Sequence, residues 1–83
     1  MVVEKVEWDP YFEKLISKID SGQKEKVKTQ IRKIIENPEV GKPMRYARKG
    51  TQEVYVKPFR LSYIYIPEES KIIFLDLYYK DKQ

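Results

Sequence analysis

The residues best suited to chemistry lie near the ends of two apolar runs in "KPFRLSYIYIPEESKIIFLDLYYKDK", residues 57–82. Arg60 begins the first run, and Tyr78 and Lys80 close the second. Hairpin pairing places the start of one run beside the end of the other. Guanidinium groups match phosphate oxygens and stabilise a pentacoordinate transition state, and tyrosine stacks on bases or transfers protons. The pattern predicts a phosphodiester site at these residues, with Lys57 as a further candidate.

The same spacing also has a purely structural interpretation. Opposite charges on adjacent strands commonly pair. In this interpretation Arg60 pairs with Asp76, and Tyr78 covers the surface of the sheet. Spacing alone leaves both interpretations open.

Among its 83 residues the chain has no cysteine and no histidine. This composition excludes a thiol nucleophile, an imidazole base, a disulfide framework and a zinc site of the usual kind. Chemistry is left to Arg, Lys, Tyr, Asp, Glu or the backbone, and no metal or cofactor is expected. The sequence lacks a signal-peptide pattern and a run of about 20 apolar residues, so we expect a cytoplasmic protein without a membrane partner.

Positive charge is concentrated in the middle third of the chain. Residues 21–50 carry nine lysines or arginines and three acidic residues. Such a region indicates a polyanionic partner, either nucleic acid or an acidic protein segment. A solvated helix face in a heat-adapted protein is the alternative. The candidates for this contact are Lys28, Arg32, Arg45, Arg48 and Lys49.

The predicted elements follow the order β-α-α-β-β-β-β. A valine-rich strand at 2–8 leads to a helix capped by Asp9, and Ser21 or Asp20 begins a second helix. This second helix ends before Asn37-Pro38. The four remaining strands are predicted at 44–49, 52–57, 59–66 and 71–79. Because their connections are short, we expect a single α+β domain over residues 1–83, with a helical hairpin packed on one face of an antiparallel sheet.

Alternation within the last two strands predicts which side chains face the helices. The inward set is Leu61, Tyr63, Ile73, Leu75 and Leu77. The outward set is Arg60, Asp76, Tyr78 and Lys80. The candidate phosphodiester site is therefore expected on the open face of the sheet.

Several short motifs together resemble the RelE/ParE superfamily of toxins from toxin–antitoxin pairs. "NPEVGKPMRYARKG" is similar to the family's link after the helical hairpin, "FRLSYIYI" to its arginine-containing strand and "IIFLDLYYK" to its final strand. The resemblance covers most of the chain. It implies a RelE/ParE-like fold and a small toxin that a cognate antitoxin neutralises by wrapping over it. A heterotetramer with the antitoxin is among the assemblies that the resemblance implies.

In RelE-like members the target is mRNA in the ribosomal A site, which is cut when a 2′-hydroxyl attacks the neighbouring phosphate. By this resemblance Arg60 matches the family arginine, and Lys80 stands where a second arginine is expected. Tyr78 and Lys57 are then candidates for proton transfer or base stacking. The cations at 24–33 and 42–49 are candidates for binding ribosomal RNA. The implied activity is that of a metal-independent, ribosome-dependent mRNA endoribonuclease, an mRNA interferase that inhibits translation.

The chain departs from the RelE-like pattern in two places. Glu53 and Tyr55 lie in the strand where RelE-like nucleases present lysines, and no tyrosine follows the last strand. These departures favour the alternative of a ParE-like gyrase inhibitor or a catalytically degenerate toxin that acts by binding. A stand-alone RNA-binding module is a third hypothesis, although the sequence carries no standard RNA-recognition signature.

Overall fold

The computed structural model describes residues 3–43 and 50–79. The predicted strand at 44–49 lies outside these residues, as do the candidates Arg45, Arg48, Lys49 and Lys80. The other candidates lie inside them. These are Arg60, Tyr78, Lys57, Lys28 and Arg32.

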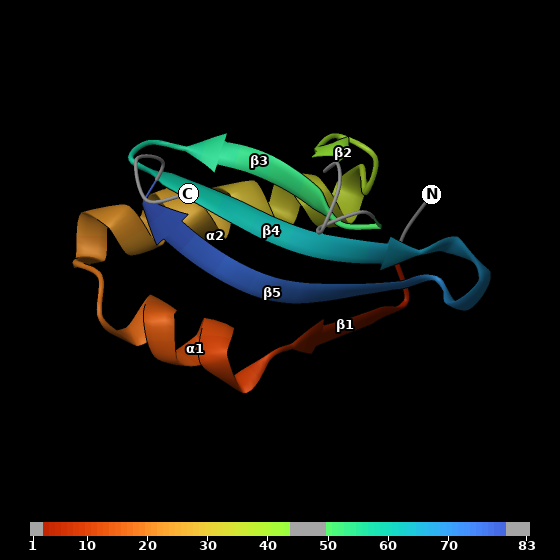
Figure 1. Cartoon of the computed structure of the whole chain (residues 1–83), viewed down its shortest axis with the longest axis horizontal. Helices are drawn as coiled ribbons and strands as arrows, with labels where there is room; N and C mark the ends of the chain where they lie inside the picture. The colour runs from red at the N-terminus through yellow and green to blue at the C-terminus, as the bar shows by residue number, and fades with distance from the viewer. Residues whose placement is uncertain (1–2, 44–49, 80–83) are drawn as a thin grey trace.

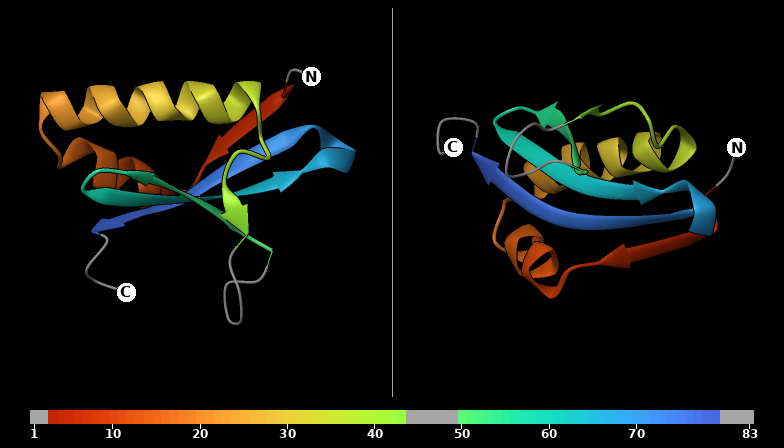
Figure 2. Two further views of the ribbon diagram at one scale, coloured as in Figure 1. Left: turned by 90° about the horizontal axis from the view of Figure 1, so that it is seen from above. Right: turned by 45° about the vertical axis from the view of Figure 1, so that its right-hand side comes forward.

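The described residues form two layers, with helices on one face of a sheet (Figures 1 and 2). The helices are α1 (Pro10–Ser17) and α2 (Ser21–Glu36), and a 3-10 turn, η2 (Pro67–Glu69), joins the last two strands. The strands are β1 (Lys5–Trp8), β2 (Lys42–Pro43), β3 (Gln52–Val56), β4 (Phe59–Ile66) and β5 (Lys71–Tyr79). This is the α+β class expected from the sequence. Neither of the described helices is long and apolar enough to cross a bilayer.

Both helices begin at an aspartate that caps the first turn. Asp9 Oδ1 accepts the N–H of Tyr11 at 2.9 Å. Asp20 Oδ1 accepts the N–H of Gln23 at 2.8 Å, and the Gln23 side chain accepts the N–H of Asp20 at 3.4 Å. This reciprocal pair is a capping box, so Asp20 rather than Ser21 caps α2.

The strands lie in the order β1-β5-β4-β3-β2 across the sheet. The pairs from β5 to β2 are antiparallel, as expected for strands with short connections. β1 instead runs parallel to β5, with Lys5 opposite Lys71 and Trp8 opposite Phe74. The prediction of a wholly antiparallel sheet is wrong at this edge. Both helices and the other strands separate β1 from β5 in sequence, and so long a connection allows a parallel pair.

A β-bulge interrupts the alternation of β5. Ser62 pairs with Asp76, but the next residue of β4, Tyr63, pairs with Phe74. Leu75 is therefore the extra residue on β5. Because two residues of β5 oppose one step of β4, the alternation changes sense at the bulge. Side chains after the bulge point as strict alternation predicts, and those before it point to the opposite face.

The bulge changes which residues of β5 enter the core. The assignment of Leu61, Tyr63 and Leu77 to the core is confirmed, whereas that of Ile73 and Leu75 is wrong because both are partly exposed. The buried hydrophobic residues of β4 and β5 are Phe59, Leu61, Tyr63, Ile72, Phe74 and Leu77. The helices contribute Phe12, Val27, Ile31 and Ile34 to the same core.

Tyr63 fixes the segment between α2 and β2 to the sheet. Its buried hydroxyl donates to the backbone oxygen of Pro38 at 2.8 Å and accepts the N–H of Gly41 at 2.9 Å. A Cβ atom at position 41 would lie 2.6 Å from this hydroxyl, so glycine is required there by close approach. Burial raises the pKa of the Tyr63 phenol, and the N–H of Gly41 lowers it by a smaller amount.

Candidate functional site

The open face of the sheet carries two of the predicted site residues side by side. Arg60 on β4 lies directly opposite Tyr78 on β5 in the strand register. Both side chains are partly exposed, whereas their chain neighbours Leu61 and Leu77 are buried in the core beneath the helices. The helices cover one side of the sheet (Figure 2, left). On β3, Tyr55 lies opposite Arg60, so an aromatic residue occupies the neighbouring strand on each side of the arginine.

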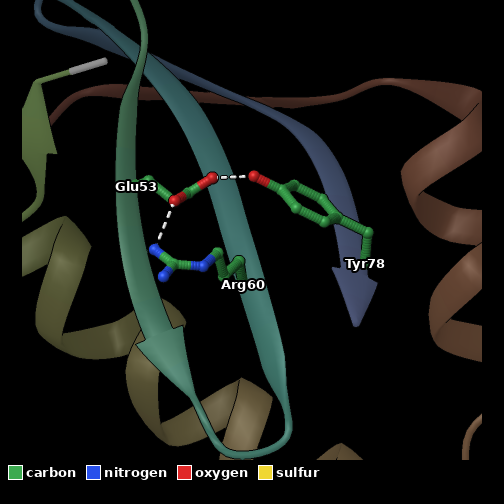
Figure 3. A network of polar contacts seen from close by, with 3 residues as sticks. All are labelled: Glu53, Arg60 and Tyr78. Carbon is green, nitrogen blue, oxygen red and sulfur yellow. Dashed lines mark hydrogen bonds and ion pairs between the residues drawn. The ribbon is translucent and has the colours of Figure 1, made fainter. Parts of the chain in front are cut away.

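Arg60 and Tyr78 meet at Glu53 of β3 (Figure 3). Arg60 Nη1 donates to Glu53 Oε1 at 2.8 Å. The hydroxyl of Tyr78 donates to the other carboxylate oxygen, Oε2. We call these three residues the Glu53 cluster. It holds a carboxylate, a guanidinium and a phenol on three adjacent strands.

The alternative interpretation in which Arg60 pairs with Asp76 is wrong, because Arg60 pairs with Glu53. Asp76 lies opposite Ser62 and accepts the N–H of Leu77 at 2.8 Å. Asp76 and the neighbouring bulge at Leu75 are on β5. This strand lies on one side of β4, and β3 with Glu53 lies on the other. The ion pair of Arg60 crosses to β3 instead.

The Glu53 cluster is asymmetric in its exposure to solvent. The side chain of Glu53 is only 4% exposed, whereas that of Arg60 is 30% exposed. The buried carboxylate is acceptable because two donors satisfy it. Arg60 Nε is buried and has no hydrogen-bond partner among the described residues. The guanidinium thus faces solvent in part while its charge is balanced by Glu53.

The other predicted residues within the described ranges are not gathered around this cluster. Lys57 is exposed in the turn between β3 and β4. Lys28 and Arg32 are exposed on α2, in the helical layer, and Lys28 lies 3.8 Å from Glu25. The two α2 cations and Arg60 therefore lie on different layers of the molecule.

Glu53 is the residue that the sequence-based site lacked. The two residues between β3 and β4 fix the register, with Val56 opposite Phe59, so Glu53 falls opposite Ser62 and diagonal to Arg60. Diagonal neighbours lie within reach of long side chains. The short connection at 57–58 thus indicates that Glu53 lies within reach of Arg60.

The cluster's polar groups suit anion binding and proton transfer. Arginine binds phosphate, and a carboxylate beside a phenol supplies a proton acceptor and a donor. Within residues 3–43 and 50–79, no three acidic side chains are placed to hold a metal ion.

Known structures share this architecture, although no protein-family model and no curated protein sequence matches the chain. The RelBE2 toxin–antitoxin complex from Mycobacterium tuberculosis aligns with a TM-score of 0.84 and 21% identity, covering 95% of this chain and 100% of that one. A YoeB/ParE toxin from Agrobacterium tumefaciens aligns with a TM-score of 0.81 and 15% identity, covering 92% and 98%. The intact RelBE complex from E. coli aligns with a TM-score of 0.78 and 17% identity, covering 90% and 94%.

The chain thus has the fold of RelE-like toxins. The fold resemblance drawn from the short sequence motifs is confirmed. At these identities the similarity establishes the fold, and the functional argument rests on the chain's own residues.

Proposed function

We propose that this protein is the toxin of a toxin–antitoxin pair and acts as a ribosome-dependent mRNA endoribonuclease. The observation that carries the proposal is the Glu53 cluster, which sits on the open sheet face of a RelE-like fold. The solved complexes of similar fold are toxin–antitoxin assemblies, which supports a cognate antitoxin as the partner.

In the proposed reaction the 2′-hydroxyl of one nucleotide attacks the adjacent phosphorus, and the bond to the 5′-oxygen of the next nucleotide breaks. Glu53 accepts the proton of the attacking hydroxyl, and the phenol of Tyr78 donates a proton to the departing oxygen. The products are a 2′,3′-cyclic phosphate and a 5′-hydroxyl. The hydrogen bond between Tyr78 and Glu53 then returns the proton from the carboxyl group to the phenolate.

Arg60 stabilises the negative charge that develops on the phosphorane oxygens. Lys80 and Lys57 are proposed as supporting cations for the substrate backbone. The proposed contacts to ribosomal RNA are made by Lys28, Arg32, Arg45, Arg48 and Lys49. A ribosome is large enough to contact the helical layer and the open face of the sheet at once, which suits the separation of Lys28 and Arg32 from Arg60.

Primer extension on mRNA from translating ribosomes tests the proposal. Wild-type protein is expected to give new 3′ ends within codons. Arg60→Ala is expected to lower the cleavage rate by about a hundredfold or more, as when a donor to a developing oxyanion is removed. Asp76→Asn is the matched control, because it changes a carboxylate of the same sheet that lies outside the cluster. Unchanged cleavage by Arg60→Ala would show that the reaction occurs elsewhere.

A second candidate is a toxin that binds its target without cleaving RNA, such as a ParE-like inhibitor of DNA gyrase. The ion pair between Glu53 and Arg60 favours this second candidate, because a nuclease needs the positive charge of Arg60 and Glu53 balances it. A supercoiling assay with purified gyrase separates the two candidates. An mRNA interferase leaves supercoiling unchanged, whereas loss of supercoiling with intact mRNA supports the second candidate.

A further inference from the structure

The carboxylate of Glu53 occupies the position that a ligand anion would take on Arg60. Arg60 Nη1 lies 2.8 Å from Glu53 Oε1, the distance of a charge-assisted hydrogen bond. The carboxylate is nearly buried, at 4% exposure, so water screens this contact poorly. A phosphate that approaches Arg60 therefore meets a guanidinium that is already paired with the carboxylate of Glu53.

The geometry of the guanidinium sharpens this competition. A bidentate contact to phosphate uses either both Nη atoms or Nε together with one Nη atom. Nη1 is engaged by Glu53, and Nε is buried without a partner among the described residues. Bidentate binding of a phosphate therefore either shares Nη1 with Glu53 or brings Nε out of its buried position, so the phosphate competes with Glu53 for the guanidinium or requires Arg60 to move.

We propose that Glu53 is a resident counter-anion that RNA phosphate must displace from Arg60, so that the unoccupied site discriminates against weakly held anions. The inference rests on the proposed function, because that function supplies RNA as the ligand. A single free anion gains too little from Arg60 to separate the pair, whereas an RNA held by further contacts brings its phosphate at high local concentration. Displacement also frees one oxygen of Glu53 from the guanidinium, so the carboxylate gains proton-accepting capacity as the substrate arrives.

The test measures binding separately from cleavage. A fluorescein-labelled oligonucleotide with 2′-O-methyl groups at every position lacks the attacking hydroxyl, so it binds without reacting. Fluorescence anisotropy gives its affinity for wild-type protein, Glu53→Gln, Arg60→Ala and the double variant. Asp76→Asn is again the control for removal of a nearby negative charge, and thermal unfolding confirms that each variant is folded.

Glu53→Gln is expected to bind the oligonucleotide more tightly than wild type by on the order of tenfold, the value of one charge-assisted hydrogen bond. The gain is expected to vanish in the Arg60→Ala background, because Glu53 acts through Arg60. Asp76→Asn is expected to stay close to wild type. If Glu53→Gln binds no more tightly than Asp76→Asn, or gains equally with Arg60 absent, Glu53 is not a competing anion and the inference is wrong.

Two further measurements keep the inference testable if Glu53→Gln does not fold. Glu53→Asp retains the charge but shortens the reach toward Arg60, so it is also expected to tighten binding. In wild-type protein, the carboxyl ¹³C resonance of Glu53 is expected to shift on titration with the oligonucleotide, and an unshifted resonance at saturation contradicts displacement.

Cleavage on ribosomes separates the two proposals. If both are right, Glu53→Gln binds RNA more tightly and yet cleaves it more slowly, because the proton acceptor is gone. Tighter binding with no cleavage even by wild type supports the counter-anion and rejects the nuclease. Cleavage by wild type without a change in the binding of Glu53→Gln supports the nuclease and rejects the counter-anion.

Discussion

The phenol of Tyr63 couples two distant parts of the chain through one oxygen atom. It donates to Pro38 after α2 and accepts from Gly41 before β2. Both contacts are buried, so no water replaces a lost partner. This side chain therefore holds the segment that leads into β2, the strand in which Lys42 pairs with Glu53 of β3.

Tyr63→Phe is expected to lower the free energy of unfolding by about 1–3 kcal/mol, because the buried N–H of Gly41 loses its acceptor. Urea unfolding measures the change. Tyr65→Phe is the matched control, since Tyr65 lies on the same strand and is only partly buried, and its effect is expected to stay within about 0.5 kcal/mol. Equal effects of the two variants would contradict the role given to the Tyr63 hydroxyl.

The raised pKa of Tyr63 predicts a loss of stability in alkaline solution. Its pKa in the folded protein lies above the ordinary value of 10.0, so above that pH the unfolded chain releases its proton first. The free energy of unfolding from this group is therefore fully present below pH 10 and falls as pH rises through the folded pKa. The pKa of Lys71 is also raised, by Glu69 and Glu7. Because Lys71 is present in wild type and in Tyr63→Phe, its contribution cancels when the two proteins are compared. Urea titrations between pH 9 and about 12 are expected to show a steeper fall for wild type than for Tyr63→Phe.

Gly41 and Gly22 provide a paired test of close approach. At Gly41 a Cβ atom would lie 2.6 Å from the Tyr63 hydroxyl, whereas at Gly22 the nearest atom would lie at 3.5 Å. Gly41→Ala is expected to destabilise the protein by about 1–3 kcal/mol through overpacking. Gly22→Ala, within α2, is expected to be neutral or to stabilise by up to about 1 kcal/mol. Thermal unfolding of both variants measures the difference, and a stable Gly41→Ala protein would contradict the contact.

At the scale of the elements, periodicity predicted the helices and the hairpin strands closely but missed the bulge. Helical spacing and the caps at Asp9 and Asp20 are local signals, so they are readable from the sequence. A bulge depends on the packing of both strands, and residues 72–75 of β5 are all apolar, so the two faces of the strand look alike in the sequence there. Alternation therefore offered no sign that the pattern changes sense there.

The bulge gives a direct prediction for two neighbouring residues. Phe74 is fully buried and stacks with Trp8 and Phe12, whereas Leu75 is partly exposed. Phe74→Ala is expected to cost about 3–5 kcal/mol, and Leu75→Ala clearly less. Chemical denaturation measures both. A larger effect at Leu75 than at Phe74 would contradict the bulge and support the uninterrupted strand that alternation predicts.

The candidate site was predictable in part for the same reasons. Alternation and hairpin pairing correctly brought Arg60 and Tyr78 to one face, because both lie on the same side of the bulge. The partner of Arg60 was missed because the sequence offers two carboxylates, Asp76 and Glu53, on the strands beside it. The choice between them depends on burial and side-chain reach, which the strand pattern does not contain.

At the scale of the whole molecule, Lys28 and Arg32 of α2 lie on a different surface from Arg60 of β4. The molecule measures 21 Å along its shortest axis, the direction of view in Figure 1, in which α2 lies behind the sheet. The screening length at physiological salt is about 8 Å. The cations of α2 therefore act on ligands nearly independently of Arg60.

This separation predicts a ligand-dependent effect of the α2 cations. The double variant Lys28→Gln/Arg32→Gln is expected to bind an uncleavable tetranucleotide like wild type, whereas Arg60→Ala binds it more weakly. Binding to intact ribosomes is expected to weaken in the double variant and to lose part of its salt dependence, because two phosphate contacts are removed. Anisotropy for the tetranucleotide and co-sedimentation for ribosomes measure these effects. Equal losses for both ligands would place all the cations on one surface.

The parallel pair of β1 and β5 sets the order in which a newly synthesised chain becomes complete. Residues 5–8 leave the ribosome early, but their partners at 71–74 follow only after both helices and the other strands. Synthesis proceeds at about 5–20 residues per second, so β1 waits several seconds for its neighbour. Trp8, the single tryptophan, stacks on Phe74 only when that pair forms. The nascent chain therefore lacks the β1 edge of its sheet during synthesis. The complete fold forms only after β5 has been synthesised.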